Sequence, residues 1–230
     1  MDSFLEKRHL SLREAERKAE ELFKTIEEKG ILRKGVTEKQ INREIYDLAF
    51  QMYGIKKYWH KRIVRAGKNT LYPYRENPPD LTVREDDIIF LDFGPIFDDW
   101  EADFGRTFVL GEDPIKIKLC NDIALAWDEG KQYFESHPNM TGSELFSFVS
   151  ALARKYGWEY GGPHAGHLIG EFPHEQIQGE EVENYIHPDN HIPMNASDQN
   201  GCPRDWILEI HFVDRELEIG GFMEQLLTVD

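Results

Sequence analysis

Residues 91–111, LDFGPIFDDWEADFGRTFVLG, place two aspartates within a strand-like pattern of apolar residues. The pattern predicts an antiparallel hairpin, in which directly opposed residues keep a constant sum of residue numbers. With the turn centred just after Phe97, Asp92 faces Asp103, with Cβ atoms about 4.5 to 5.5 Å apart. Two negative charges repel each other at that distance, so the pair predicts a divalent cation bound between them.

A second pair of acidic residues lies near the carboxyl end of the chain. Glu209 and Glu224 stand in the strand-like segments WILEIHFVD and FMEQLLTV, on either side of the polar turn DRELE. Their midpoint falls inside that turn, so they are also expected to face each other. Each pair alone is compatible with solvated surface carboxylates, but the apolar neighbours favour burial, and buried carboxylates need a partner. Four such groups can hold two metal ions about 3.5 to 4 Å apart.

Nitrogen ligands are available in the segment GGPHAGHLIGEFPHE, which contains His164, His167 and His174. Imidazole suits manganese, iron, cobalt or zinc better than calcium or magnesium. A site that mixes carboxylates with imidazole therefore predicts a catalytic transition metal.

Composition narrows the class of protein. The 230 residues include 43 acidic and 27 basic side chains, and the formal net charge of −16 argues against nucleic acid as the ligand. The length predicts one folded unit over residues 1–230. Two cysteines, and the lack of any signal-like or membrane-spanning apolar run, predict a cytoplasmic protein that uses neither a disulfide framework nor a membrane.

One order of elements occurs twice along the chain, namely two helices followed by antiparallel strands. Each helix is expected to begin at a capping residue, at Ser11, Thr37, Asp113 and Thr141. The first copy continues with hairpins over 61–74, turning near Gly67 and Lys68, and over 86–111. The second continues with the segments HAGHLIG, WILEIHFVD and FMEQLLTV, interrupted by a long polar loop.

The repeat predicts an α+β fold with two pseudo-twofold halves, at about 11–111 and 112–230. An antiparallel sheet is expected to carry the helices on one face. The other face is then expected to hold the functional site.

At these residues the sequence resembles the methionine aminopeptidase and Xaa-Pro aminopeptidase (prolidase) metallopeptidase family, over roughly residues 11–229. DFGRT resembles the Asp-x-x-Arg-Thr segment of that family, and GHLIGEFPHE resembles its Gly-His-x-x-Gly segment with a second histidine seven residues on. The ligands of the family come in the order Asp, Asp, His, Glu, Glu, and the matching residues here are Asp92, Asp103, His167, Glu209 and Glu224. The resemblance implies a pita-bread fold, the catalytic domain only, and two divalent ions, with manganese favoured over cobalt, iron or zinc.

The resemblance also implies a role for each ligand. Asp103 and Glu224 would bridge the ions, Asp92 would chelate one of them, and His167 with Glu209 would complete the other. A water between the ions would become hydroxide near neutral pH and attack a peptide carbonyl. Glu209 would move the proton.

Histidines on the substrate side are also implied. His174 would hydrogen-bond the substrate or the developing oxyanion. A further histidine is expected where LYPYREN has Pro73, and the first predicted hairpin would bring His60 nearly opposite that position. We therefore expect His60 to be the catalytic replacement, whose change to alanine lowers turnover without loss of metal. His164 is the other candidate.

The resulting prediction is a dinuclear-metal-dependent peptidase that removes an N-terminal residue or dipeptide from small peptides, with Xaa-Pro substrates favoured. Pro163 and Phe222 stand where Xaa-Pro enzymes tend to carry a histidine and an arginine, and the Cys-His-Gly-Ile-Pro segment of methionine aminopeptidases is absent. A non-catalytic binding module of the same fold, methionine specificity and a metal-free creatinase-like hydrolase remain alternatives. A monomer and a homodimer are both left open.

Overall fold

The structure, a computed structural model, describes residues 2–72, 74–173, 182–197 and 201–229. In these residues the helices are α1 (Asp2–Glu28), α2 (Glu38–Tyr53), α3 (Pro114–Ser136), α4 (Gly142–Tyr156) and the short 3-10 helices η1 (Gly67–Leu71) and η2 (Val182–Asn184). The strands are β1 (Ile63–Ala66), β2 (Ile88–Phe93), β3 (Ile96–Phe97), β4 (Trp100–Glu101), β5 (Phe104–Val109), β6 (Glu159–Tyr160), β7 (Leu168–Ile169), β8 (Asp205–Asp214) and β9 (Ile219–Leu226). Within the described part of the chain, each helix is too short or too polar to cross a membrane.

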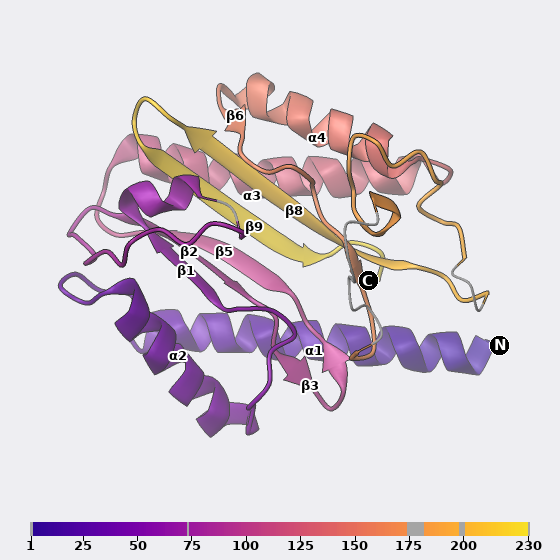
Figure 1. Cartoon of the computed structure of the whole chain (residues 1–230), viewed down its shortest axis with the longest axis horizontal. Helices are drawn as coiled ribbons and strands as arrows, with labels where there is room; N and C mark the ends of the chain where they lie inside the picture. Colours follow the sequence, from indigo (N-terminus) through magenta and orange to yellow (C-terminus); the bar gives the residue numbers. More distant parts are fainter. Residues whose placement is uncertain (1, 73, 174–181, 198–200, 230) are drawn as a thin grey trace.

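One antiparallel sheet joins the two halves of the chain (Figure 1). Its strands follow the order β1-β2-β5-β9-β8-β6, and β7 also pairs with β8. The first three strands come from the first half and the last three from the second, and the halves meet where β5 pairs with β9. This order confirms the predicted α+β fold of two related halves.

Each half has its own helices and its own core. Helices α1 and α2 lie beside the strands of the first half, α3 lies behind β8 and β9, and α4 packs beside α3 and β6 (Figure 1). Phe23 of α1 packs with Leu91 of β2 in one core, and Leu119 of α3 packs with Leu208 of β8 in the other. Full burial of each such side chain stabilises the fold by about 1.5–3 kcal/mol.

Local sequence explains how three of the helices begin and how two of them end. Thr37 and Thr141 each form the predicted capping box, with Gln40 and Glu144, and the Asp113 side chain accepts hydrogen bonds from the first backbone N–H groups of α3. Helices α2 and α4 end at glycines with a left-handed backbone.

The prediction that the first helix begins at Ser11 is wrong, because α1 already begins at Asp2. Arg8 fixes the extra turns through tertiary contacts. Its Nε donates to Asp205 Oδ2 at 2.5 Å, and its Nη2 donates to the Ile169 carbonyl at 3.1 Å. Arg8 is 6% exposed, so the capping signal at Ser11 is overridden by contacts with the second half of the chain.

The predicted hairpin over 61–74 is also wrong. Strand β1 pairs with β2 instead, and the chain turns into η1 at Gly67. The buried carboxylate of Glu38 causes this turn, because its Oε1 accepts from Ala66 N at 2.7 Å and its Oε2 accepts from Asn69 Nδ2 at 2.9 Å. These bonds hold the chain against α2 and prevent a return strand.

The hairpin over residues 88–109 forms, but with a different register from the predicted one. Its turn consists of Asp98 and Asp99, with φ of 50° and 72°, so Asp92 pairs with Gly105 and does not face Asp103. A shift of two residues keeps every side chain on its predicted face, because the side-chain period of a strand is two. Asp92 and Asp103 are therefore diagonal neighbours.

Candidate metal centre

One row of paired residues crosses the centre of the sheet. Asp92 on β2 pairs with Gly105 on β5, Gly105 pairs with Glu224 on β9, and Glu224 pairs with Glu209 on β8. Paired residues point to the same face of a sheet, so the three carboxylates share one face. The Glu209–Glu224 pairing is the predicted one.

Gly105 keeps the middle of this row open. A Cβ atom there would lie 2.6 Å from two ring carbons of Phe222 and 3.0 Å from Glu224 Cβ. Because no side chain stands at this position, the carboxylates of Asp92 and Glu224 can approach a common centre.

Asp103 lies in that centre, between two imidazole rings. Its Oδ1 is 3.0 Å from His60 Nε2, and its Oδ2 is 3.1 Å from His167 Nε2. His167 Nε2 is also 3.6 Å from Glu209 Oε1 and 3.7 Å from Glu224 Oε1. The structure thus brings all five predicted metal ligands into one cluster, which contains residues from both halves of the chain.

The cluster is almost removed from solvent. Asp92 is 7% exposed, Asp103 3%, His167 5% and Glu224 2%, and the Glu209 side chain is 13% exposed. Asp92 Oδ1 and Glu224 Oε2 are buried without a hydrogen-bond partner among the described residues. An unpaired buried carboxylate oxygen is costly, and a bound cation removes that cost. This donor set therefore fits divalent metal ions.

The pKa values show how unevenly the cluster holds charge. Burial raises the pKa of Asp92 to about 7 and that of Glu209 to about 8, against the lowering effect of the histidines. Burial also acts to raise the pKa of Asp103, but His60 and His167 outweigh it and lower that pKa to about 2. Burial also raises the pKa of Glu224 well above its ordinary value, so Glu209 and Glu224 hold protons at neutral pH in the metal-free cluster, and bound cations would displace them.

The other predicted site residues are placed as follows. His60 reaches the cluster, although not through the predicted hairpin: the chain returns beside it, with the Tyr74 ring centred 5.5 Å from the His60 ring. His164 lies at the edge of the cluster, with Nδ1 3.7 Å from Glu209 Oε2. His174 lies outside the described residues.

Comparison with known proteins agrees with this geometry. Residues 11–198 match the metallopeptidase family M24. The chain belongs to this family.

Relatives within the M24 family include dipeptidases. The Xaa-Pro dipeptidase of Lactobacillus delbrueckii subsp. lactis is 30% identical over 146 residues, which are 63% of this chain and 39% of that protein. The Xaa-Pro dipeptidase of Pyrococcus horikoshii is 28% identical over 145 residues, which are 61% of this chain and 40% of that protein. The chain thus spans about two-fifths of the length of these curated relatives.

Solved structures confirm the predicted pita-bread fold of the M24 family. The X-Pro aminopeptidase of Thermotoga maritima superposes with a TM-score of 0.73 at 21% identity, covering 98% of this chain and 62% of that one. The methionine aminopeptidase of Rickettsia prowazekii also gives 0.73, at 17% identity, covering 97% of this chain and 94% of that one.

The sequence did not single out two residues that shape this M24 site, Trp59 and Gly105. The Trp59 ring lies 4.5 Å from the His60 ring and 5.1 Å from the His167 ring, and its Nε1 donates to the Ala102 carbonyl at 3.1 Å. The position of Trp59 directly before His60 in the sequence was a signal that the two rings pack together at the site. The glycine at position 105, in a strand close to Asp103, was a signal that the row of paired residues lacks a side chain at that point.

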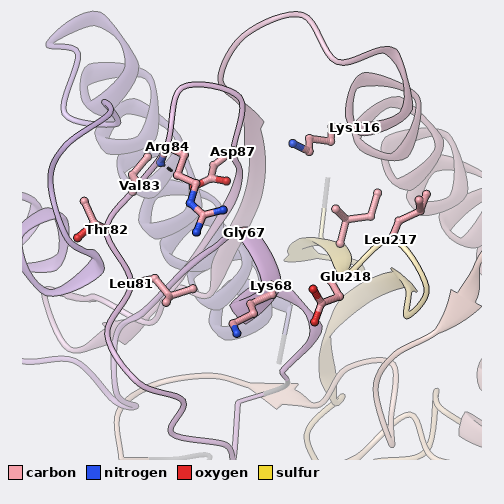
Figure 2. A pocket seen from close by; sticks show the side chains of 11 residues that line it. Gly67, Lys68, Leu81, Thr82, Val83, Arg84, Asp87, Lys116, Leu217 and Glu218 are labelled. Atoms are coloured by element: carbon pink, nitrogen blue, oxygen red, sulfur yellow. Dashed lines mark hydrogen bonds between the residues drawn. The ribbon is translucent and has the colours of Figure 1, made fainter.

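A separate groove of about 590 Å³ lies away from the cluster (Figure 2). It runs between η1, the segment before β2 and the start of β9, and none of its lining residues belongs to the cluster. Its charged side chains have both signs, as Figure 2 shows for Lys68, Arg84, Asp87 and Glu218. This mixture defines no preference for one class of ligand.

Proposed function

We propose that this M24 chain is a dinuclear-metal-dependent peptidase that removes an N-terminal residue or dipeptide from small peptides, with Xaa-Pro substrates favoured. The observation that carries the proposal is the cluster of buried carboxylates and imidazoles, with its two unpaired carboxylate oxygens. The relatives named Xaa-Pro dipeptidase support the choice of substrate.

Five residues would hold the two ions. Asp103 and Glu224, at the centre of the cluster, would be shared by both ions, Asp92 would bind one, and His167 with Glu209 would bind the other. When bound, the ions would lower the pKa of coordinated water and polarise the scissile carbonyl. Manganese is the first ion to test, followed by cobalt, iron and zinc. A cytoplasmic location is part of the same proposal.

Glu209 is the residue we assign to proton transfer. Its side chain is 13% exposed and that of Glu224 only 3%, so it is the more accessible of the opposed pair. Burial raises the pKa of Glu209 to about 8 in the metal-free cluster, and a bound cation would lower it and leave an oxygen that can accept a proton.

His164 is the substrate-side histidine that the geometry supports best. Its side chain is 24% exposed at the edge of the cluster, and its Nδ1 has no hydrogen-bond partner among the described residues. Burial, together with the charge of His167, lowers the pKa of His164 to about 3, so the ring stays neutral. A neutral imidazole there can donate a hydrogen bond to a substrate carbonyl. His174 is proposed for the same side of the substrate.

Elemental analysis and hydrolysis assays test the proposal together. The purified protein is expected to bind two ions per chain and to cleave Xaa-Pro dipeptides faster than peptides with N-terminal methionine. Asp103→Asn is expected to lose both properties, while Glu112→Gln, a change at an exposed residue outside the cluster, keeps them. Less than one ion per chain with every metal tried, and no cleavage, would support a non-catalytic binding module instead.

A further inference from the structure

We propose that His60 is a sixth protein ligand of the metal centre, so that each of the two ions has its own imidazole. The proposal rests on the proposed function in one respect, because it takes the cluster to bind two ions. It replaces the substrate-side role expected from the sequence.

The donor atoms form two groups of three that share Asp103. One group contains His60, Asp92 and Asp103, and the other contains Asp103, His167 and Glu224. Each oxygen of Asp103 contacts a different imidazole, Oδ1 that of His60 and Oδ2 that of His167. A carboxylate placed in this way can bind one ion through each oxygen.

The distances around His60 suit a common ion. Its Nε2 is 3.0 Å from Asp103 Oδ1 and 3.5 Å from Asp92 Oδ1. Donor atoms bound to one ion at about 2.0–2.2 Å lie about 3–3.6 Å from each other. The corresponding distances from His167 Nε2 are 3.1 Å to Asp103 Oδ2 and 3.7 Å to Glu224 Oε1. The two imidazoles therefore have equivalent surroundings.

The other ring nitrogen fixes the tautomer. His60 Nδ1 lies 2.8 Å from the carbonyl of Lys61, and His167 Nδ1 lies 2.8 Å from the carbonyl of Leu168. A carbonyl oxygen only accepts, so Nδ1 carries a proton in both rings and Nε2 is left to face the carboxylates. Metal-binding histidines typically donate their second ring N–H to a carbonyl in this way. His164 lacks such a bond at Nδ1.

An unpaired oxygen faces the same position. Asp92 Oδ1 has no hydrogen-bond partner among the described residues, and it lies 3.5 Å from His60 Nε2. An ion between these two atoms would satisfy both of them.

The ring of His60 is tightly packed and little exposed. A Cβ on Gly94 would lie 2.2 Å from His60 Cδ2, so only glycine permits the ring to sit there. The Trp59 ring packs against the ring of His60, and Trp59 N donates to the Gly94 carbonyl at 3.0 Å. The side chain of His60 is 7% exposed, compared with 24% for His164. This burial suits a ligand better than a group that contacts substrate.

Cobalt provides the test. The protein is stripped of metal and titrated with Co²⁺, with stoichiometry followed by calorimetry and the ligands followed by proton NMR of the paramagnetic complex. The wild type is expected to bind two ions and to show two strongly shifted imidazole N–H signals that exchange with D₂O. His60→Ala is expected to show one such signal and to bind one of the ions at least about tenfold more weakly. His164→Ala is the matched control and is expected to keep both.

Each alternative result is decisive. A single shifted N–H signal in the two-ion wild type would overturn the proposal without recourse to any variant. Wild-type affinity for both ions in His60→Ala, with lowered turnover, would return His60 to the substrate side. Failure of the wild type to bind Co²⁺ would overturn this proposal and the proposed function together.

Peptide hydrolysis by the same samples separates the two proposals. Two bound ions and two N–H signals without hydrolysis of any peptide would contradict the proposed peptidase activity and support His60 as a ligand. Hydrolysis with only one N–H signal would contradict the ligand role of His60 and support the proposed peptidase activity.

Discussion

Glu209 and Glu224 lie directly opposite each other on β8 and β9, and their side chains are 13% and 3% exposed. Opposed like charges destabilise a strand pair, and burial adds to the cost. Burial raises the pKa of both carboxyl groups, to about 8 for Glu209 and well above its ordinary value for Glu224. The pair therefore weakens the folded state unless cations bind beside it.

Metal binding is expected to stabilise the fold. Because the assembled cluster exists only in the folded chain, Mn²⁺ at a hundred times its dissociation constant is expected to add about 2.7 kcal/mol to the free energy of unfolding. The measurement is the thermal unfolding midpoint of metal-free protein, with and without Mn²⁺. The increase is expected to vanish in Asp103→Asn and to persist in Glu112→Gln. An equal increase in both variants would mean that the ion binds elsewhere.

Replacement of Gly105 by alanine is expected to damage the metal centre from within the sheet. The added Cβ would lie 2.6 Å from the Phe222 ring and 3.0 Å from Glu224 Cβ, so these side chains must shift, at a cost of about 1–3 kcal/mol. Urea unfolding measures this loss, and metal titration of the folded variant is expected to show weaker binding. Unchanged stability and unchanged metal affinity would show that the row tolerates a side chain at its centre.

The turn at Asp98 and Asp99 is expected to accept glycine. Both residues have positive φ, which glycine adopts without the steric penalty of a Cβ, so Asp99→Gly is expected to stabilise the protein by about 0.5–1 kcal/mol. The matched change Asp99→Ala also removes the carboxylate but keeps a Cβ, and is expected to destabilise. Urea unfolding compares the two variants. A higher stability for Asp99→Ala than for Asp99→Gly would contradict the assigned turn.

Glu16 is expected to make stability depend on pH. Burial raises its pKa from an ordinary 4.5 to about 7, although Leu226 N donates a hydrogen bond to its Oε1 at 2.7 Å. Between these two values the folded chain binds more protons than the unfolded chain, so this group's stabilising contribution falls as pH rises from about 4.5 to 7, by at most about 1.4 kcal/mol per pH unit.

Glu16→Gln removes this titration while keeping an oxygen that can accept the Leu226 hydrogen bond. The free energy of unfolding of the variant, relative to the wild type, is therefore expected to rise as pH increases from 5 to 7 in urea titrations. Glu28→Gln, at an exposed position near the end of the same helix, is the control and is expected to keep the pH dependence of the wild type. Parallel curves for Glu16→Gln and the wild type would rule out a buried, titrating Glu16.

Local patterns in the sequence carry much of the fold. Capping boxes at Thr37 and Thr141 and the cap at Asp113 place three helices, because these signals satisfy backbone groups within a few residues. The pairing of Glu209 with Glu224 follows from the midpoint between them, since the connection of β8 to β9 adds no bulge. By contrast, the start of α1 depends on Arg8 meeting Asp205, a contact across nearly the whole chain.

By itself, the sequence determined which residue types stand on the inner face of each hairpin. Asp92 pairs with Gly105 instead of Asp103, but this shift of two residues equals the side-chain period of a strand, so every side chain keeps its face. It also determined the order of the five candidate ligands. Only the tertiary structure decided which atoms meet. The backbone of Asp98 and Asp99 set the register, and packing of Trp59 against Gly94 turned His60 toward Asp103, because these distances depend on contacts between segments that no local pattern encodes.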